Sequence, residues 1–149
     1  MTFAEFFGSD DGGGGGNVYV NAPLVDFGLQ SASNGVTLVL DFPDVGALSP
    51  GRDSIVFVLS RRALHSDADA ELLVVDDSVT RVGGRAAEPA TAGGLVVNDE
   101  TDGSITLNVP AATMQLLQPD LYQYAVKEVS GSSTRYLIAP ARFELTDGS

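Results

Sequence analysis

Hydrophobic and polar residues alternate along several short stretches of the chain, the period-two pattern of half-buried β-strands. In residues 35–42, GVTLVLDF, four apolar side chains are expected on one face: Val36, Leu38, Leu40 and Phe42. Residues 54–60, SIVFVLS, form an almost continuous apolar run of strand length. Such a run predicts a strand in the centre of a sheet.

Further strands are predicted on both sides of these two. Residues 17–21, NVYVN, alternate and end before Pro23, and residues 70–77, AELLVVDD, follow an acidic turn. The clearest hairpin joins GLVVN to SITLNV through the turn DETDG at residues 99–103. Aspartate and glycine favour tight turns, so the two flanking stretches are predicted to pair with each other.

The last third of the chain predicts a helical turn and two strands. Residues 110–120, PAATMQLLQPD, favour one or two helical turns, with Pro110 at an allowed early position and Pro119 ending the helix. Residues 121–129 place Tyr122, Tyr124 and Val126 on one face. Residues 134–145 predict the final strand, with a bend or bulge at Pro140. The small, glycine-rich residues 78–94 are predicted to be mostly loop.

Together these stretches predict seven to nine short strands and no long amphipathic helix. We therefore expect an all-β fold, a β-sandwich with a barrel as the alternative. The sandwich domain is assigned to residues 17–149. Residues 1–16 are assigned to an N-terminal arm that includes the run Gly12–Gly16, since polyglycine behaves as a flexible linker.

Composition and charge narrow the possible functions. The chain has 149 residues, of which 44% are hydrophobic and 19% charged, as in a globular domain. Its net charge of −12 opposes binding to nucleic acid or to an anionic membrane surface. It has no cysteine, which excludes disulfides and thiolate metal sites. No apolar run approaches the roughly 20 residues that span a bilayer.

Candidate catalytic groups are few. His65 is the only histidine. Acidic residues that could act as an acid–base pair are Asp76–Asp77 and the group Asp99, Glu100 and Asp102. A triad or an acid–base pair requires groups brought together from separate elements. All of these residues fall in predicted turns, where solvated polar side chains are usual. We therefore expect no enzymatic activity.

Binding motifs for metals and cofactors are also weak. Residues 98–103, NDETDG, resemble the start of a calcium loop, but the twelfth position is Val109 instead of glutamate. A hairpin turn explains Asn98–Asp102 more simply, and a weak calcium site is the alternative. The glycine run lacks the Lys-Ser/Thr of a phosphate loop. No cofactor or metal is expected.

Four aromatic residues lie on the predicted C-terminal strands. Because they alternate with polar residues, they are assigned to core and edge packing instead of a sugar-stacking platform. They are Tyr122, Tyr124, Tyr136 and Phe143.

Residues 102–145 resemble a β-sandwich module common in structural proteins of tailed viruses, typified by the amino-terminal domain of phage baseplate upper proteins. This chain departs from the module at three positions. Asp120 stands where the module has glycine, Ala125 where it has aspartate, and Pro140 or Ala141 where it has the glycine before the last strand. The matching positions are Asp102-Gly103, Leu116-Leu117, Tyr122-Gln123-Tyr124, Arg135-Tyr136-Leu137 and Phe143.

The resemblance implies an immunoglobulin-like sandwich located in a virion and carries over no catalytic residue. It predicts a non-enzymatic structural protein of a tailed virus, a capsid decoration (cement) or accessory protein. A small tail, baseplate or fibre-joining adaptor is the first alternative. A carbohydrate-binding β-sandwich is the second.

The arm then gains a predicted role in docking. Phe3, Phe6 and Phe7 are expected to bury themselves on a neighbouring virion protein, a major capsid or tail protein, with the domain oligomeric or bound to the lattice. Burial of one phenylalanine is worth about 1.5–3 kcal/mol before ordering costs. The linker that provides the reach consists of Gly12, Gly13, Gly14, Gly15 and Gly16.

Overall fold

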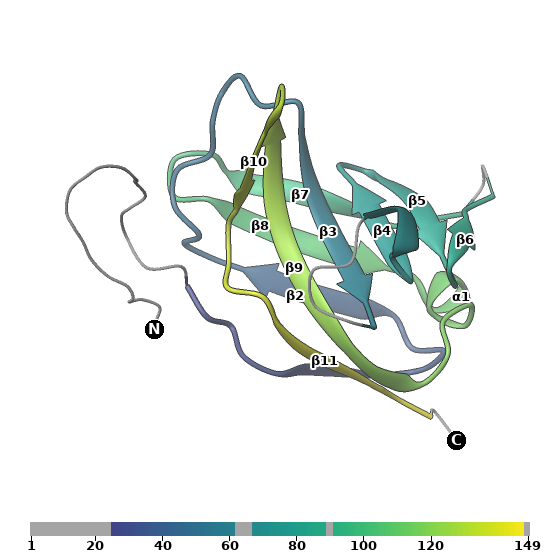
Figure 1. Cartoon of the computed structure of the whole chain (residues 1–149). Coiled ribbons are helices and arrows are strands. Elements are labelled where there is room, and N and C mark those ends of the chain that lie inside the picture. The colour runs from purple at the N-terminus through teal and green to yellow at the C-terminus, as the bar shows by residue number, and fades with distance from the viewer. Residues whose placement is uncertain (1–24, 62–66, 89–90, 148–149) are drawn as a thin grey trace.

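The computed structural model describes residues 25–61, 67–88 and 91–147, which form eleven strands and one short helix (Figure 1). The predicted arm, residues 1–16, the strand predicted at 17–21 and His65 lie outside the described residues. The strands are β1 (Gln30–Ser33), β2 (Leu38–Phe42), β3 (Ser54–Ser60), β4 (Leu72–Val75), β5 (Ser78–Val82), β6 (Arg85–Ala86), β7 (Gly94–Asp99), β8 (Ser104–Val109), β9 (Asp120–Ser130), β10 (Ser133–Tyr136) and β11 (Ala141–Thr146).

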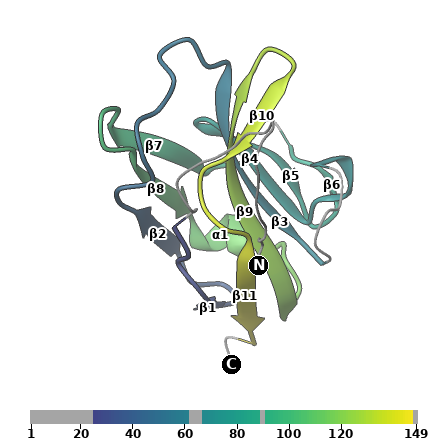
Figure 2. The ribbon, with the colours of Figure 1, turned by 60° about the vertical axis from the view of Figure 1, so that its left-hand side comes forward.

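The strands form two sheets packed face to face (Figure 2). The larger sheet has the order β1-β11-β9-β3-β4-β5-β6, and β10 also pairs with β9. The smaller sheet has the order β2-β8-β7. The pair β1–β11 is parallel, and the other strand pairs are antiparallel. The predicted β-sandwich is confirmed, and the barrel is not formed. The predicted number of seven to nine strands was too low, because the described residues form eleven.

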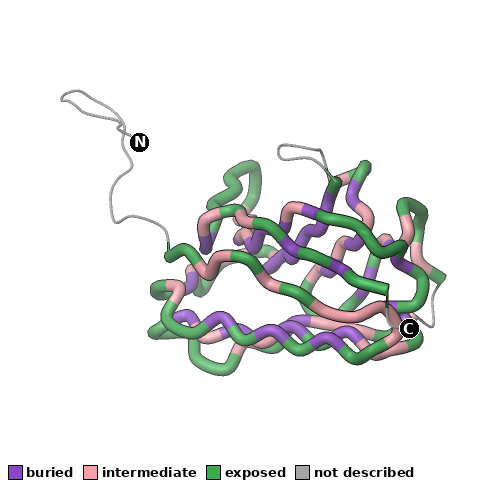
Figure 3. Tube along the Cα trace, turned by 90° about the horizontal axis from the view of Figure 1, so that it is seen from below, coloured by how far each residue is buried: buried purple, intermediate pink, exposed green. Residues whose placement is uncertain are grey.

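The core lies between the sheets and is filled by alternate residues of the strands. Buried and exposed segments alternate along the tube in Figure 3. In β2 the pattern is strict, with Leu38, Leu40 and Phe42 buried and the residues between them exposed. β3 is buried at nearly every position because it lies between β9 and β4 and is covered on both faces. The predicted central strand is therefore confirmed.

The strand order is that of a variable-type immunoglobulin sandwich. In that fold one sheet carries strands G, F, C, C′ and C″ and the other carries B, E and D. β2 corresponds to B, β3 to C, β4 and β5 to C′ and C″, β7 to D, β8 to E and β9 to F. β10 and β11 are two parts of strand G, separated at Pro140 where the sequence predicts a bend. β1 pairs in parallel with β11, as a short first strand beside G.

Aromatic rings connect the two sheets in a chain that has no cysteine. The ring of Tyr124 on β9 stacks on Phe57 of β3, with centroids 6.2 Å apart. Phe42 of β2 approaches Tyr124 from the other sheet at 6.3 Å. In antibody domains a disulfide between strands B and F packs against a tryptophan on strand C. Here three rings from the same three strands fill the centre of the sandwich.

Tyr122 forms the tyrosine corner of this fold. Its hydroxyl donates a hydrogen bond to the main-chain carbonyl of Gln118, four residues earlier, at 2.5 Å. Corners of this kind join the start of strand F to the connection that precedes it. That connection contains α1 (Ala111–Met114), so the predicted helical turn is confirmed.

Three sequence predictions need correction. Residues 78–94 were predicted to be mostly loop, but eight of their fifteen described residues lie in β5, β6 and the start of β7. β1 was not predicted, because QSAS has no large apolar residue and is half-buried at a sheet edge. Val36 does not share the buried face of β2: it follows the turn Asn34–Gly35 and is 54% exposed.

Part of the outer face of the larger sheet is covered by the connection between β3 and β4. Ala70 in this connection is fully buried against Val58 and Ala125. Nearby, the ammonium of Lys127 donates to Asp67 Oδ1 at 2.6 Å. The only lysine of the chain therefore ties the short 3-10 turn Asp67–Asp69 to β9.

Candidate functional site

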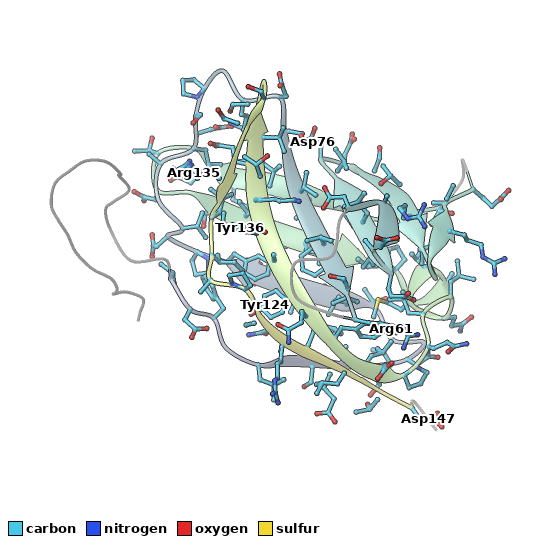
Figure 4. The ribbon with its side chains drawn as sticks, in the orientation of Figure 1. Arg61, Asp76, Tyr124, Arg135, Tyr136 and Asp147 are labelled. Atoms are coloured by element: carbon cyan, nitrogen blue, oxygen red, sulfur yellow. The ribbon has the colours of Figure 1, made fainter. Side chains whose placement is uncertain are left out.

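Four connections meet at one end of the sandwich, which we call the loop end. They are residues 43–53, 76–77, 100–103 and 131–132, the B–C, C′–C″, D–E and F–G connections. Asp76 and Arg135 lie toward this end, and Arg61 and Asp147 lie toward the opposite one (Figure 4). In variable-type domains the corresponding B–C, C′–C″ and F–G connections form the antigen-binding surface. The loop end is therefore the first place to look for a functional site.

The loop end is built around the carboxylate of Glu128 on β9, whose side chain is only 3% exposed. Glu128 Oε2 accepts a hydrogen bond from the backbone N–H of Ser49 at 2.8 Å, and Oε1 accepts one from the Ser49 hydroxyl at 2.8 Å. The guanidinium of Arg135 on β10 donates to Oε1 from Nε and Nη2, at 3.2 and 3.0 Å. One buried acid thus joins the B–C connection to strands F and G.

The electrostatics of Glu128 follow from these partners. Burial by itself raises the pKa of a carboxyl group, because it disfavours the charged form. The donors from Ser49 and the charge of Arg135 outweigh burial, so the pKa of Glu128 lies below its ordinary value. The carboxylate is therefore ionised at neutral pH, and its hydrogen-bonding capacity is directed at the protein.

A second ion pair joins the B–C connection to the D–E turn. Arg52 forms a bidentate pair with Glu100, with Nη1–Oε1 at 2.6 Å and Nη2–Oε2 at 2.8 Å. Arg52 Nη1 also donates to the carbonyl of Ser49 at 3.1 Å. The hydrogen bonds between the two groups raise the pKa of Arg52 and lower that of Glu100.

Two aspartates of the loop end, Asp53 and Asp76, accept hydrogen bonds from main-chain N–H groups of other elements. Asp53 Oδ2 accepts from the N–H of Gly131 at 2.6 Å, which joins the B–C connection to the F–G turn. Asp76 Oδ1 accepts from Ile55 N–H at 2.9 Å, and the carbonyl of Asp76 accepts from Leu95 N–H at 2.7 Å. Asp76 holds a positive φ of 52°, so these contacts fix a left-handed residue in a tight turn.

The D–E turn is closed by its own first residue. Asp99 Oδ1 accepts from the N–H groups of Thr101 and Asp102, at 2.8 and 3.1 Å. Gly103 has a φ of +75°, and a Cβ there would lie 1.9 Å from the carbonyl oxygen of Gly46. Only glycine permits this approach, and the N–H of Val45 donates to Gly103 O at 2.9 Å.

The acids considered for catalysis are thus placed in structural roles. Asp76 accepts hydrogen bonds from strands β3 and β7, Asp99 closes its own turn, and Glu100 bonds Arg52 of the B–C connection. Asp77 and Asp102 are exposed at the same end. Both the donor and the acceptor of each hydrogen bond described above belong to the protein. What this arrangement does chemically is hold four connections in fixed positions.

The calcium alternative at Asn98–Asp102 meets the same arrangement. The amide of Asn98 does not turn toward Asp99: its Nδ2 donates to Thr106 Oγ1 at 2.8 Å, on the outer face of the smaller sheet. Thr106 in turn donates to Asp41 Oδ1 at 2.7 Å. Within the described parts of the chain, no group of three or more His, Cys, Asp or Glu side chains is arranged to hold a metal ion.

The other residues singled out in the sequence are four aromatic side chains of the C-terminal strands and the docking residues of the arm. Tyr122, Tyr124 and Phe143 are buried, as predicted, and Tyr136 is 39% exposed on β10. The proposed docking residues lie outside the described residues: Phe3, Phe6, Phe7, Gly12, Gly13, Gly14, Gly15 and Gly16.

Sequence reasoning missed the two arginines and the glutamate that organise the loop end. Ser49 and Glu128 are 79 residues apart in the chain. The available signal was Glu128 itself, a charged residue placed by the alternation of β9 on the same face as Tyr124 and Val126. An acid on a core face requires a buried partner.

Comparison with protein-family models and with curated protein sequences finds no relative of the chain. The chain matches no protein-family model and no curated protein sequence. Among the described residues, no helix has the length and apolar character needed to cross a membrane.

Proposed function

We propose that the chain is a non-enzymatic structural protein of a tailed virus particle, a capsid decoration or accessory protein that docks through residues 1–16. A small tail, baseplate or fibre-joining adaptor is the alternative within the same class. Its partners are other virion proteins, and the immunoglobulin-like domain is the rigid body that the arm attaches to the particle.

The observation that carries the proposal is the structural part played by the residues that resemble the viral module. Residues 102–145 span β8 of the smaller sheet, the connection that contains α1, and β9, β10 and most of β11 of the larger sheet. Gly103 occupies a left-handed turn, Leu117 is a buried residue of the E–F connection, and Tyr122 and Tyr124 supply the corner and the central ring. These matching positions have different structural roles, a turn, a buried connection, a corner and a central ring. Such a match supports the resemblance to the viral module better than a match of apolar residues alone.

The use of polar groups supports a structural role over an enzymatic one. At the loop end, Glu128 and Arg52 hold the B–C connection, and Asp53 and Asp76 hold turns. A catalytic carboxylate needs free capacity toward a substrate. A rigid loop end suits a protein that must keep its shape in an assembly.

The start of the described chain supports docking through the arm. Val25 lies at the edge of the larger sheet, where it pairs with Ile138. Residues ahead of Val25 are therefore joined to the domain at its periphery. Three phenylalanines on a glycine linker add binding energy by burial and by effective concentration, because the tether keeps them near the partner.

The carbohydrate-binding alternative depends on exposed aromatic rings. Tyr136 is exposed, whereas the other aromatic side chains of the described residues are buried or half-buried. One ring does not form a stacking surface for a sugar chain. The described residues therefore favour the virion role over carbohydrate binding.

The test is the protein content of particles produced by the genome that encodes the chain. Quantitative mass spectrometry of purified particles should detect the chain in every preparation. Hundreds of copies per particle indicate a capsid lattice, and a small multiple of six or twelve indicates the tail or neck. Absence of the chain from purified particles contradicts the proposal.

A further inference from the structure

β1 forms an open edge of the larger sheet. Among the described strands it pairs with β11 alone, and it is the last strand on its side of the sheet (Figure 2). The carbonyl of Ala32 accepts from Thr146 Oγ1 at 3.3 Å, and the N–H of Asn34 donates to the carbonyl of Thr146 at 2.8 Å. Main-chain groups of successive residues in a strand point to opposite sides, so those of Ser31 and Ser33 point away from β11. Such groups favour the addition of another strand.

The smaller sheet does not extend past this edge. The ring of Phe42 on β2 lies beside that of Tyr124 on β9, with centroids 6.3 Å apart. β7, at the other end of the smaller sheet, contacts β4 and β5. β2 is therefore the strand of the smaller sheet nearest to β1, and β1 lies two strands beyond β9 in the order β9-β11-β1. A strand added to β1 meets no strand of the smaller sheet.

The edge of β1 differs in charge from the other edges of the described sheets. Its residues, QSAS, include no charged side chain and no proline. The other edge strands each carry a charge: Asp41 in β2, Arg85 in β6, Asp99 in β7 and Arg135 in β10. Charges on an edge strand oppose its pairing with another strand. In a chain with a net charge of −12, an uncharged edge is where two copies can approach with the least repulsion.

From these observations we propose that two copies of the chain pair through β1, as antiparallel strands around a two-fold axis at Ser31. This register places Ser31 opposite Ser31 of the second copy and Leu29 opposite Ser33 of the second copy. The outward main-chain groups of the two copies then meet, and no charged residues lie opposite each other. Leu29, which is 60% exposed in the single chain, is covered by the second copy.

This pairing joins the two larger sheets into one. Because the strands run antiparallel across the axis, the two loop ends point in opposite directions. A four-residue edge is a short contact, so we expect a weak dimer, with a Kd between about 1 μM and about 1 mM. The inference goes beyond the proposed function, since it concerns the purified chain whether or not that chain belongs to a virus particle.

A single engineered cysteine in the full-length chain tests the register, because the chain has no cysteine of its own. Ser31→Cys places two thiols at the axis, where the paired Cα atoms are about 5.5 Å apart and within disulfide range. The control is Ser133→Cys, at an exposed serine of β10. We expect Ser31→Cys to form covalent dimers at least about tenfold faster than Ser133→Cys at equal concentration. Equal rates, or a faster rate in Ser133→Cys, overturn the proposal.

Sedimentation equilibrium gives a second readout without cysteines. The wild type should change from monomer to dimer as its concentration rises from about 10 μM to about 1 mM. Ser31→Asp places two carboxylates opposite each other and should raise the Kd at least about tenfold, whereas Ser133→Asp should keep the wild-type Kd. Thermal unfolding shows whether each variant is folded. A wild type that stays monomeric throughout, or an unchanged Kd in folded Ser31→Asp, overturns the proposal.

Discussion

The carboxylate of Glu128 accepts two hydrogen bonds from Ser49, one from its backbone N–H and one from its hydroxyl, both at 2.8 Å. Replacement of Glu128 by Gln keeps the shape of the side chain but presents an amide to donors from Ser49 and Arg135. We expect a loss of about 1.5–3 kcal/mol in the free energy of unfolding, the range for hydrogen bonds to charged groups. Urea denaturation measures it.

Glu144→Gln is the matched control, since Glu144 is exposed on β11. It should leave the denaturation midpoint unchanged. Equal midpoints for Glu128→Gln and Glu144→Gln would show that the contacts of Glu128 do not stabilise the domain.

The same carboxylate predicts a dependence of stability on pH. The pKa of Glu128 lies below its ordinary value of 4.5 in the folded protein, so the unfolded chain binds the proton more readily. Its contribution to stability is complete above the unfolded pKa and is lost as the pH falls through the folded pKa. The difference in unfolding free energy between the wild type and Glu128→Gln should therefore shrink below about pH 4.5. A constant difference from pH 7 to pH 3 would contradict this.

The tyrosine corner predicts a cost for removing one oxygen atom. Tyr122→Phe leaves the ring in the core and removes the donor to the carbonyl of Gln118. An unfulfilled carbonyl and a lost hydrogen bond should together cost about 1–3 kcal/mol of unfolding free energy. Tyr136→Phe, at an exposed position of β10, is the control and should have little effect. Thermal unfolding compares the two variants, and similar melting temperatures would argue against a structural corner.

Burial raises the pKa of Tyr122 to about 12. The folded protein therefore holds the phenolic proton where the unfolded chain releases it, and this part of the stability is lost as the pH rises above about 10. The gap between wild type and Tyr122→Phe should narrow at alkaline pH, as measured by urea denaturation at pH 8 and above. A gap that stays constant to pH 11 would contradict the assignment.

The contact of the D–E turn with the B–C connection predicts a strict requirement for glycine. A Cβ at Gly103 would lie 1.9 Å from Gly46 O, and the residue has a φ of +75°. Gly103→Ala should therefore destabilise the domain by more than about 1 kcal/mol. Gly51→Ala is the control, because a Cβ at Gly51 meets nothing within 4 Å. Equal denaturation midpoints for the two variants would contradict the close approach of the two loops.

The sequence predicted the strands whose side chains alternate without interruption. β2 and β8 follow this pattern, β9 follows it except at Ala125 and Glu128, and β3 is recognised by its continuous apolar run. β5 was missed because its pairing with β4 contains an irregularity: Leu73 pairs with Arg81 and Val74 with Val79, which leaves Thr80 without a partner residue. Its two buried valines, Val79 and Val82, are consequently three residues apart, so the period of two is absent.

The loop end could not be predicted for a different reason. Its contacts join residues far apart in the chain, as in Ser49–Glu128 and Arg52–Glu100, and depend on which strands are neighbours. Turn chemistry near each aspartate was visible in the sequence, and Asp99 closes its predicted turn. The ion pairs between connections follow from the sheet order, which the local pattern does not specify.

The most direct test of the central claim is the incorporation of variants into virus particles. Phe3→Ser, Phe6→Ser and Phe7→Ser are combined in one chain. The control combines Val36→Ser, Val39→Ser and Val96→Ser, three exposed apolar residues of the domain. Both variants should fold, as judged by their thermal unfolding. Quantitative mass spectrometry of purified particles should find the phenylalanine variant reduced at least about tenfold and the control present at the wild-type copy number. Incorporation of the folded phenylalanine variant at the wild-type copy number would contradict docking through the arm.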